Sequence, residues 1–432
     1  MSLFGALDTA ISGLSSQSSA FGNIGDNIAN SQTTGFKRVD TSFLDYLTTS
    51  TQTDNQPGAV VAVPLYVNTV QGTIAQTDNP LALAISGQGF FAVSQAAGSS
   101  ATGPVLSPQP YYTRAGDFQL DKNGYLVNSA GDYLNGWLAQ GNGTIDTNTL
   151  APIQISESQY KPVASSNVTL SANLPPAGNP STTNPAVQAP ITSNVSVYDA
   201  QGQSHQLTLS FTSAGANSND WSLTVTDDLG NTIGTGTLTF GADGTLASVT
   251  QGGTTVSAAG AAGSLTLNTV YPAAGGGTQS IALNLGTIGG TGGLTQFAGS
   301  GYALHGISQD GVPPGNFSSI TMQTNGDVVV NYDNGQTRTI AQVPLTTFAA
   351  PDALQRQDGA DFTATIGSGP ALTQAAGSNG AGTLVTSSIE QSNVDIANEF
   401  SQLIVAQQAY SANAKTVTTA DAMLQATLDM VR

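Results

Sequence analysis

Residues 27–38 read NIANSQTTGFKR, and this stretch marks a change in the pattern of the sequence. Before it, apolar residues recur every three or four positions, whereas after residue 65 runs rich in Val, Thr and Ile alternate with turn residues. The stretch has the composition of a helix end, because Gly35 is a stop signal and the basic pair Lys37 and Arg38 suits the negative end of a helix dipole. The sequence therefore predicts that a helix ends here and that a β-rich region follows.

Both ends of the chain carry an apolar stripe with helical spacing. Neither Pro nor Gly occurs between residues 383 and 432, so residues 396–431 can form one helix about 54 Å long. Ser, Gly, Gln and Asp interrupt the stripes. Two such helices leave apolar surface exposed to solvent even when they pack on each other. We therefore expect copies of the same chain to cover them. The residues assigned to this subunit packing are Phe4, Leu7, Ile11, Leu14, Phe21, Ile28, Ile396, Phe400, Leu403, Tyr410, Val417, Leu424 and Leu428.

The region between the helical ends has the pattern of β-hairpins. Asn-Gly and Asp-Gly pairs separate its strand-like runs, at residues 123–124, 243–244, 325–326 and 334–335. Pro and Gly cluster at residues 174–190 and again at 285–301, which predicts two linkers around an inserted β domain.

These patterns predict a mainly β protein with α-helical ends. The N- and C-terminal helices form a coiled-coil-like inner domain, and the outer of two nested β-rich domains is inserted into the inner one. The predicted divisions are residues 1–34 plus 390–432 for the helical inner domain, 35–70 plus 376–389 for connecting segments, 71–164 plus 301–375 for a β-rich middle domain, and 165–300 for the inserted outer β domain.

Charge and composition exclude several classes of partner. The chain has 432 residues with 9 Lys and Arg against 27 Asp and Glu, so it cannot neutralise a row of phosphates, and we expect no nucleic acid partner. No apolar run approaches the roughly 18 residues of a membrane span, so we expect no membrane insertion, and the N-terminus lacks the features of a cleavable signal peptide. Cysteine is absent, which excludes disulfides and thiolate metal sites.

The sequence offers little for catalysis. It contains no GxSxG, HExxH, GxGxxG or GxxxxGK motif, and His205 and His305 have no neighbours at ligand spacing. The pair Asp227 and Asp228 precedes a Leu-Gly turn, and LDKNGYL at residues 120–126 lacks the later ligands of a calcium loop. We therefore expect no enzyme activity, no cofactor and no metal site.

Two side-chain patterns in the β region have local interpretations. Phe90 and Phe91 are adjacent, so in a strand they point to opposite faces, one into the core and the other against a neighbouring element. Arg114 precedes Asp117 by three residues, and the simplest expectation for this pair is a local ion pair or turn contact.

Four segments resemble, in order and spacing, those of one family. They are NIANSQTTGFKR at residues 27–38, LAISGQGFFAV at 83–93, YTRAGDFQLDKNGYLVN at 112–128 and SNVDIANEFSQLIVAQQAYSANAKTV at 392–417. The chain is identified by them as a member of the rod and hook family of bacterial flagellar axial proteins. One departure is Gln408, at a position where the family often has Arg. Rod members have a shorter middle, so the extra domain at residues 165–300 resembles the hook members.

The resemblance implies a structural function. It implies a subunit that self-assembles into a curved helical tube, a flexible universal joint that transmits torque from the motor and rod to the filament. It also implies export through the flagellar type III apparatus to the cell exterior without a cleavable signal peptide. Besides many copies of the same chain, the implied partners are the distal rod protein, the hook cap protein, the hook-filament junction protein and the hook-length control protein.

The resemblance also gives a role to the opening stretch. It places a junction between the helical layer and the β domains at Asn27, Asn30, Gly35, Phe36, Lys37 and Arg38. The basic pair of this junction is expected to meet acidic groups of neighbouring subunits. Two other functions stay open, a rod or junction component of the same family and a secreted β-rich binding module or adhesin.

Overall fold

The computed structural model describes residues 3–50, 55–100, 103–141, 143–176, 189–215, 218–271, 277–298 and 301–430. Within these residues the chain is mainly β with one long helix toward each end, which confirms the predicted mainly β fold with helical ends. The helices are α1 (Leu3–Ala29) and α2 (Ile396–Met430). The chain divides into two compact units. Unit 1 comprises Met1–Glu157, Ser318–Asn331 and Thr337–Arg432, and unit 2 comprises Ser158–Phe317 and Tyr332–Gln336.

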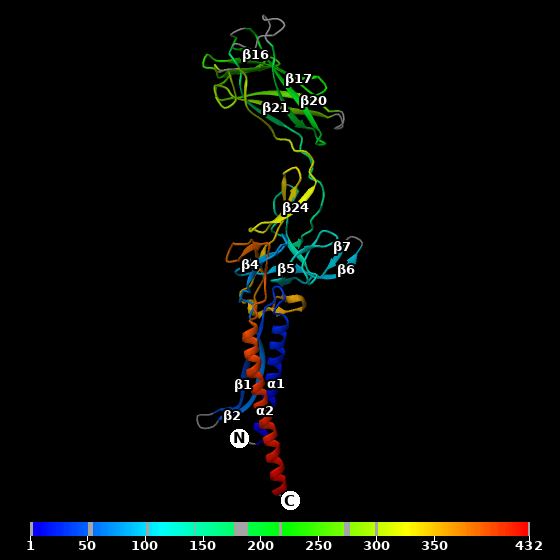
Figure 1. The fold of residues 1–432 in the computed structure, drawn as a ribbon, viewed down its shortest axis with the longest axis vertical. Coiled ribbons are helices and arrows are strands. Elements are labelled where there is room, and N and C mark those ends of the chain that lie inside the picture. The colour runs from blue at the N-terminus through cyan, green and yellow to red at the C-terminus, as the bar shows by residue number, and fades with distance from the viewer. Residues whose placement is uncertain are drawn as a thin grey trace. The chain divides into compact units, whose positions relative to one another are not determined.

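In unit 1 the two helices lie side by side and antiparallel (Figure 1). Gly13 lies against Asn413, and the Phe21 ring meets the edge of Tyr410 at a centroid distance of 6.1 Å. A Cβ atom at Gly13 would lie only 2.8 Å from the Asn413 amide nitrogen. The helices therefore approach closely at this level because Gly13 has no side chain.

A long hairpin of β1 (Val39–Ser50) and β2 (Asn55–Tyr66) runs along α1 (Figure 1). The sequence predicted only a connecting segment at residues 35–70, whereas the structure has a regular hairpin there. Its strands lack strict alternation of apolar and polar residues, because large apolar side chains such as Phe43 and Leu44 stand next to each other and are both exposed. What orders the hairpin is its contact with α1, and local sequence carries no signal for such a contact.

The β part of unit 1 is organised around one large sheet. Among the described residues, its central strands follow the order β24 (Phe317–Met322), β25 (Asp327–Tyr332), β26 (Thr337–Gln342), β11 (Tyr133–Leu138), β5 (Phe91–Ser94), β8 (Tyr111–Thr113), β29 (Asp361–Thr363) and β28 (Gln355–Arg356). Three short strands add to it, β9 (Gln119–Leu120), β10 (Leu126–Val127) and β12 (Ala151–Pro152). The strand pairs β3 (Ile74–Gln76) with β32 (Ser388–Glu390), β4 (Leu83–Ser86) with β31 (Thr383–Thr386), β6 (Ala96–Ser100) with β7 (Gly103–Leu106), and β27 (Leu345–Thr347) with β30 (Leu372–Gln374) complete the unit, together with the short helices η2 (Pro351–Ala353) and η3 (Asp358–Ala360).

The two adjacent phenylalanines are buried on opposite sides, as predicted. Phe90 packs edge-on against Phe348 and Phe362 in one aromatic cluster. Phe91 instead meets the ring of Phe118 at a centroid distance of 5.4 Å. Neighbouring residues in an extended chain point to opposite faces, so a single dipeptide supplies two separate contacts.

The predicted turns form, and each depends on glycine. Gly124, Gly244, Gly326 and Gly335 all have positive φ, a region that glycine adopts without steric cost. The Leu-Gly turn after Asp227 and Asp228 closes in the same way, since the Gly230 N–H donates to the Asp227 carbonyl at 3.1 Å. In LDKNGYL, the Asp121 carboxylate accepts from the backbone N–H groups of Asn123 and Tyr125, both at 2.8 Å. This carboxylate therefore shapes a turn.

Unit 2 contains two sheets among its described residues. One has the strands β20 (Ala262–Val270), β21 (Thr278–Thr287), β13 (Asn167–Asn173), β22 (Leu294–Thr295) and β23 (Ala303–Gln309). The other follows the order β14 (Ile191–Tyr198), β15 (Ser204–Ser213), β16 (Asp220–Thr226), β17 (Thr232–Phe240), β18 (Leu246–Gln251) and β19 (Thr254–Val256). Buried and exposed residues alternate along β14 and β20, so each sheet presents one apolar face to a shared core.

Residues 285–294 of the segment 285–301, which was predicted as a linker, contribute to this core instead. Leu285, Ile288 and Leu294 are all buried, and β22 pairs in parallel with β13. Glycine is frequent here because the backbone packs tightly: a Cβ atom at Gly293 would lie 2.2 Å from the Leu285 carbonyl oxygen. Glycine composition alone did not separate close packing from flexibility.

The other predicted linker, residues 174–190, includes residues 177–188, which lie outside the described residues. On either side of them, Leu174 and Ile191 belong to the same core cluster, so this segment connects two strands of one unit. Strand β23, which we placed with the flanking β segments, pairs with β13 of unit 2. In the described part of the chain, no helix is long and apolar enough to cross a membrane.

Candidate functional site

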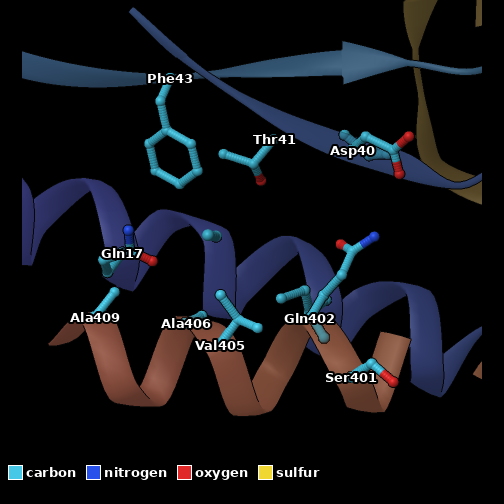
Figure 2. A pocket seen from close by; sticks show the side chains of 12 residues that line it. Gln17, Asp40, Thr41, Phe43, Ser401, Gln402, Val405, Ala406 and Ala409 are labelled. Atoms are coloured by element: carbon cyan, nitrogen blue, oxygen red, sulfur yellow. The ribbon is translucent and has the colours of Figure 1, made fainter. Parts of the chain in front are cut away.

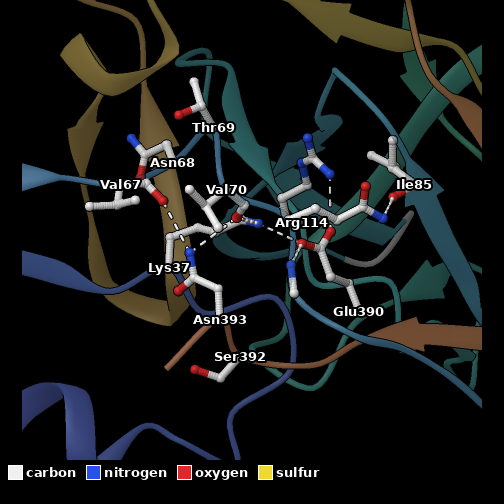
Figure 3. A network of polar contacts seen from close by, with 12 residues as sticks. Lys37, Val67, Asn68, Thr69, Val70, Ile85, Arg114, Glu390, Ser392 and Asn393 are labelled. Atoms are coloured by element: carbon white, nitrogen blue, oxygen red, sulfur yellow. Dashed lines mark hydrogen bonds and ion pairs between the residues drawn. The ribbon is translucent and has the colours of Figure 1, made fainter. Parts of the chain in front are cut away.

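A buried polar network joins the stretch of residues 27–38 to the segment that leads into α2 (Figure 3). The ammonium of Lys37 donates to Glu390 Oε1 at 2.5 Å, and Arg114 Nη1 donates to Glu390 Oε2 at 3.0 Å. The backbone N–H of Gly72 is a third donor to this carboxylate, at 2.8 Å. All three ionised side chains are at most 2% exposed. One carboxylate thus ties together three segments that are distant in the sequence.

Asn393 extends the network to the start of β1. Its Oδ1 accepts from the Arg38 N–H at 2.8 Å, and its Nδ2 donates to the carbonyls of Val67 and Val70. Lys37 Nζ also donates to the Val70 carbonyl, at 2.7 Å. The entry into the β layer and the return to α2 are therefore held by the same set of hydrogen bonds.

Gly35 permits this arrangement. Its φ is +70°, and a Cβ atom there would lie 2.3 Å from the backbone nitrogen of Ala115. Its N–H donates to the Glu390 carbonyl at 2.8 Å. The next residue, Phe36, is buried and carries the Arg356 guanidinium 4.3 Å above its ring. The sequence TGFK thus turns the chain sharply and places Lys37 in the network.

The two asparagines of NIAN have different roles. Asn27 is buried and pairs with the backbone of Val39 in both directions, each hydrogen bond being 2.9 Å long. It thereby joins α1 to the first residue of β1. Asn30 donates through Nδ2 to Asp26 Oδ1 at 2.8 Å, which closes the last turn of the helix end. Asp26 in turn pairs with Arg356 at 3.0 Å.

The electrostatics of the network favour a permanent structural role. Burial lowers the pKa of Lys37, and the charge of Glu390 opposes this effect. Burial lowers the pKa of Arg114 in the same way, again against the charge of Glu390. Arg114 also donates to the Gly87 carbonyl and stacks 5.1 Å from the centroid of Phe90. Removing one partner of such a group leaves a buried charge without compensation, which costs roughly 3–5 kcal/mol.

Two expectations about charged residues are wrong in detail. Lys37 was expected to reach acidic groups of neighbouring subunits, but it is buried and bound to Glu390 of the same chain. Only Arg38 keeps partial exposure, and its Nε lies 3.4 Å from Asp40 Oδ1. Arg114 was expected to contact Asp117, but it pairs with Glu390, 276 residues away. Sequence reasoning also missed Glu390 itself, for which no local pattern gave a signal.

Polar residues of α1 beside its apolar stripe bind the hairpin. The Thr9 hydroxyl donates to the Gly58 carbonyl, and the Ser16 hydroxyl donates to the Val60 carbonyl at 2.8 Å. The Val60 N–H donates back to the Ser12 hydroxyl. These hydrogen bonds hold β2 along the helix, so the small polar face of α1 is used within the chain.

The larger stripe residues are left partly or largely open. Leu7, Leu14, Phe21, Ile28, Leu403, Val417 and Leu424 are half-buried, whereas Ile11, Ile396, Phe400 and Tyr410 are exposed. The side chains of Phe4 and Leu428 lie outside the described part of the chain. The buried apolar residues of the two helices are mostly small, namely Ala10, Ala20, Ala406 and Ala420, with Ile24 as the larger one.

A groove of about 310 Å³ lies between α1, α2 and β1 (Figure 2). Its lining is mainly apolar and includes Ile24, Phe43, Val405 and Ala409, with Asp40 among its polar residues. Other large apolar side chains of the same two elements are exposed as well, namely Leu44, Tyr46 and Leu47 on β1 and Ile404 on α2. Exposed apolar surface of this extent is typical of an interaction face.

The described residues contain no cluster of three or more His, Asp or Glu side chains that could hold a metal ion. Both carboxylate oxygens of Glu390 accept hydrogen bonds from groups of the junction. Two features therefore stand out. One is the buried junction network around Glu390, and the other is the exposed apolar layer formed by α1, α2 and the hairpin.

Comparisons with known proteins converge on one group. Four family models match: "Flagella basal body rod protein" at residues 7–37, "Flagellar hook protein FlgE/F/G D1 domain" at 84–173, "Flagellar basal body protein FlaE D2 domain" at 167–312, and "Flagellar basal body rod FlgEFG protein C-terminal" at 385–430.

Full-length relatives agree with these matches. The chain is 31% identical to the flagellar hook protein FlgE of Brucella abortus, over 100% of both chains. It is also 31% identical to the flagellar hook protein FlgE of Escherichia coli, over 98% of this chain and 100% of that one. The crystal structure of Helicobacter pylori flagellar hook protein FlgE2 is similar at 14% identity and a TM-score of 0.47. The match covers 72% of this chain and 98% of that chain. This similarity is too distant to support an argument about the fold.

Proposed function

Because this chain belongs to the flagellar hook protein family, we propose that it is a structural subunit of the bacterial flagellar hook. The observation that carries the proposal is the full-length similarity to hook proteins, which includes the region of unit 2. A rod or junction component is not favoured, because these relatives span the whole chain and are named hook proteins. A binding module or adhesin has no specific observation in its favour.

We propose that copies of the chain assemble through the layer formed by α1, α2 and the hairpin. The small face of α1 is occupied within the chain, whereas large apolar side chains such as Phe400, Ile404 and Tyr410 stay exposed. Exposure of this much apolar surface is costly in water, and burial against neighbouring copies recovers about 25 cal/mol per Å². The stripe residues identified in the sequence are in this proposal the subunit contacts.

In this proposal the helical layer and the β domains have different roles. The helices α1 and α2, with the hairpin of β1 and β2 along α1, form the packed inner layer. The remaining β part of unit 1 and the outer unit 2 adjust their contacts with neighbouring copies as the tube bends. In this way the polymer acts as a universal joint that passes torque from rod to filament. The junction network supports this proposal, because its hydrogen bonds link the helical part of unit 1 to the β part of unit 1.

The remaining parts of the proposal rest on family resemblance. The subunit is exported by the flagellar type III apparatus and functions outside the cell. Its partners beside its own copies are the distal rod protein, the hook cap protein, the hook-filament junction protein and the hook-length control protein. No catalytic step is part of this function.

The test is electron microscopy of polymer formed from purified full-length chain. Ile404 is 55% exposed on α2, and Ile366 is fully exposed in unit 1 outside the helical layer, so Ile404→Asn and Ile366→Asn form a matched pair. We expect the Ile366 variant to form tubes like the parent chain and the Ile404 variant to lose them. Equal polymerisation of both variants would remove the helical layer from the subunit contacts. Failure of the parent chain to polymerise under any condition would contradict the hook function itself.

A further inference from the structure

The sequence contains six Asn-Gly pairs, and the structure places them in different surroundings. The pair 135–136 lies inside strand β11, where Asn135 is buried. Residue 142 of the pair 142–143 lies outside the described residues. The other four pairs lie in turns, at residues 123–124, 325–326, 334–335 and 379–380.

An asparagine that precedes glycine can react with its own backbone. The glycine nitrogen gives its proton to the solvent and attacks the asparagine Cγ, and the side-chain amide takes up a proton and leaves as ammonia. Water then opens the resulting five-membered succinimide ring, which gives aspartate or isoaspartate. Glycine favours the attack because it has no side chain to hinder the approach. The net reaction exchanges ammonia for water and needs no enzyme.

In three of the four turns the glycine nitrogen is held by a hydrogen bond. Its N–H donates to the carbonyl three residues earlier, namely Gly124 to Asp121 at 3.0 Å, Gly326 to Gln323 at 2.9 Å and Gly335 to Tyr332 at 3.1 Å. Such a bond retains the proton on the nitrogen and fixes the position of the nitrogen. The bond must therefore break before the glycine can attack.

The asparagine side chains of these three turns are held as well. Asn325 accepts from the Asp327 N–H at 3.1 Å and donates to the carboxylate of the same residue at 2.9 Å. Asn334 donates to the Pro313 carbonyl at 2.9 Å. Asn123 Nδ2 lies 3.4 Å from the carboxylate that shapes its own turn. In these turns both reacting groups are thus restrained.

The turn at Asn379 leaves both reacting groups free. The Ala381 N–H donates to the Ser378 carbonyl at 2.8 Å, and Asn379 and Gly380 between them have φ values of +46° and +87°. These are the features of a type I′ turn. Neither the Gly380 N–H nor the Asn379 side chain has a hydrogen-bond partner among the described residues. Asn379 is exposed, and the space beside Gly380 is open, since a Cβ atom there would meet nothing within 4 Å.

We propose that Asn379 is a site of spontaneous deamidation in the folded chain, and that the fold protects the pairs at 123–124, 325–326 and 334–335. The reaction adds a negative charge to the exposed turn between β30 and β31. Isoaspartate also lengthens the backbone of this turn by one carbon atom, which breaks the hydrogen bond from Ala381 to Ser378. The sequence Asn-Gly is the same at all four places, so the difference arises from the hydrogen bonds alone.

The experiment follows deamidation of the folded full-length chain in mildly alkaline buffer by peptide mass spectrometry. Incubation in ¹⁸O-labelled water marks the oxygen that enters when the succinimide ring opens, and isoaspartate is separated from aspartate by chromatography. We expect Asn379 to react roughly tenfold faster than Asn325 and Asn334, because those turns must first break hydrogen bonds at both reacting groups.

The chain in denaturant is the control for the effect of sequence. There the hydrogen bonds of the turns are lost, so the rates at the four pairs should become similar. Asn379→Asp is the matched variant, because aspartate also tolerates positive φ but has no amide to lose. Its folded chain should lack the fast reaction and keep the slow ones. Equal rates at all four pairs in the folded chain, or an Asn379 that reacts only in denaturant, would overturn the proposal.

Discussion

Glu390 accepts a hydrogen bond from Lys37, 353 residues earlier in the sequence, and both side chains are sealed from solvent. Through the second oxygen of the same carboxylate, Arg114 of the β layer joins the pair. This contact closes unit 1, because it connects the segment that leaves α1 with the segment that leads into α2. The first prediction concerns its removal.

Glu390→Gln should destabilise unit 1 by roughly 3–5 kcal/mol, because two buried cations then lack a counter-charge. Denaturant unfolding followed by residue-level exchange in unit 1 measures this. Asp26→Asn breaks the more exposed pair with Arg356 and should cost at most about 1 kcal/mol. Similar stabilities for the two variants would mean that the buried network adds nothing beyond a surface pair.

Lys37→Glu and Arg38→Glu should differ in their response to salt. Lys37 is buried, so its reversal misfolds the junction and impairs assembly at every ionic strength. Arg38 is partly exposed, and contacts between exposed charges are screened over about 10 Å at 0.1 M salt. Light scattering of assembling subunits at two salt concentrations separates these cases. A salt-dependent defect in the Lys37 variant would contradict the buried pairing.

Leu403→Pro should abolish polymerisation and leave unit 2 folded. Proline in the middle of α2 removes a backbone hydrogen bond and clashes with the preceding turn, at a cost of about 3 kcal/mol. Trp221 lies in the core of unit 2 and reports on its folding through near-ultraviolet circular dichroism. Leu403→Ala keeps the helix and removes the same side chain, so the difference between the two variants measures the effect of the kink alone. Normal tubes from the proline variant would exclude α2 from the packed layer.

Replacing residues 158–317 by a short Gly-Ser bridge should leave tube formation intact, because the proposed subunit contacts lie in α1, α2 and the hairpin. The tubes should be straighter or bend without a defined shape, as the contacts of unit 2 are gone. Electron microscopy beside the full chain gives the answer. A cut at residues 165 and 300 should do worse, because it removes β13 and leaves β23 without its partner. Unchanged curvature after the full excision would show that unit 2 has no part in setting shape.

The parts of the fold that sequence predicted are those with a local cause. The helix that ends near NIAN, the helix that begins at Ile396 and the glycine turns each depend on residues within a few positions of each other. The adjacent Phe90 and Phe91 are a similar case, since strand geometry alone sends them to opposite sides. Local spacing carries this information directly.

The parts that sequence missed depend on partners far away in the chain. The hairpin is ordered by hydroxyl groups of α1, such as that of Ser16 on the Val60 carbonyl. Arg114 was assigned to nearby Asp117 because Glu390 is 276 residues away. The glycines of residues 285–301 have the composition of a linker, yet Gly293 is there because a strand backbone passes 2.2 Å from where its Cβ would be.

The closure at Glu390 also sets an order of events. A ribosome makes the chain from its N-terminus, so Lys37 and Arg114 exist long before their carboxylate does. Until that residue arrives, burying either cation leaves it without its counter-charge, and the long loop between the partners must still be closed. We expect unit 1 to remain open until the segment that carries Glu390 has been made. The folding of unit 1 is thus delayed because Glu390 lies far along the sequence from Lys37 and Arg114.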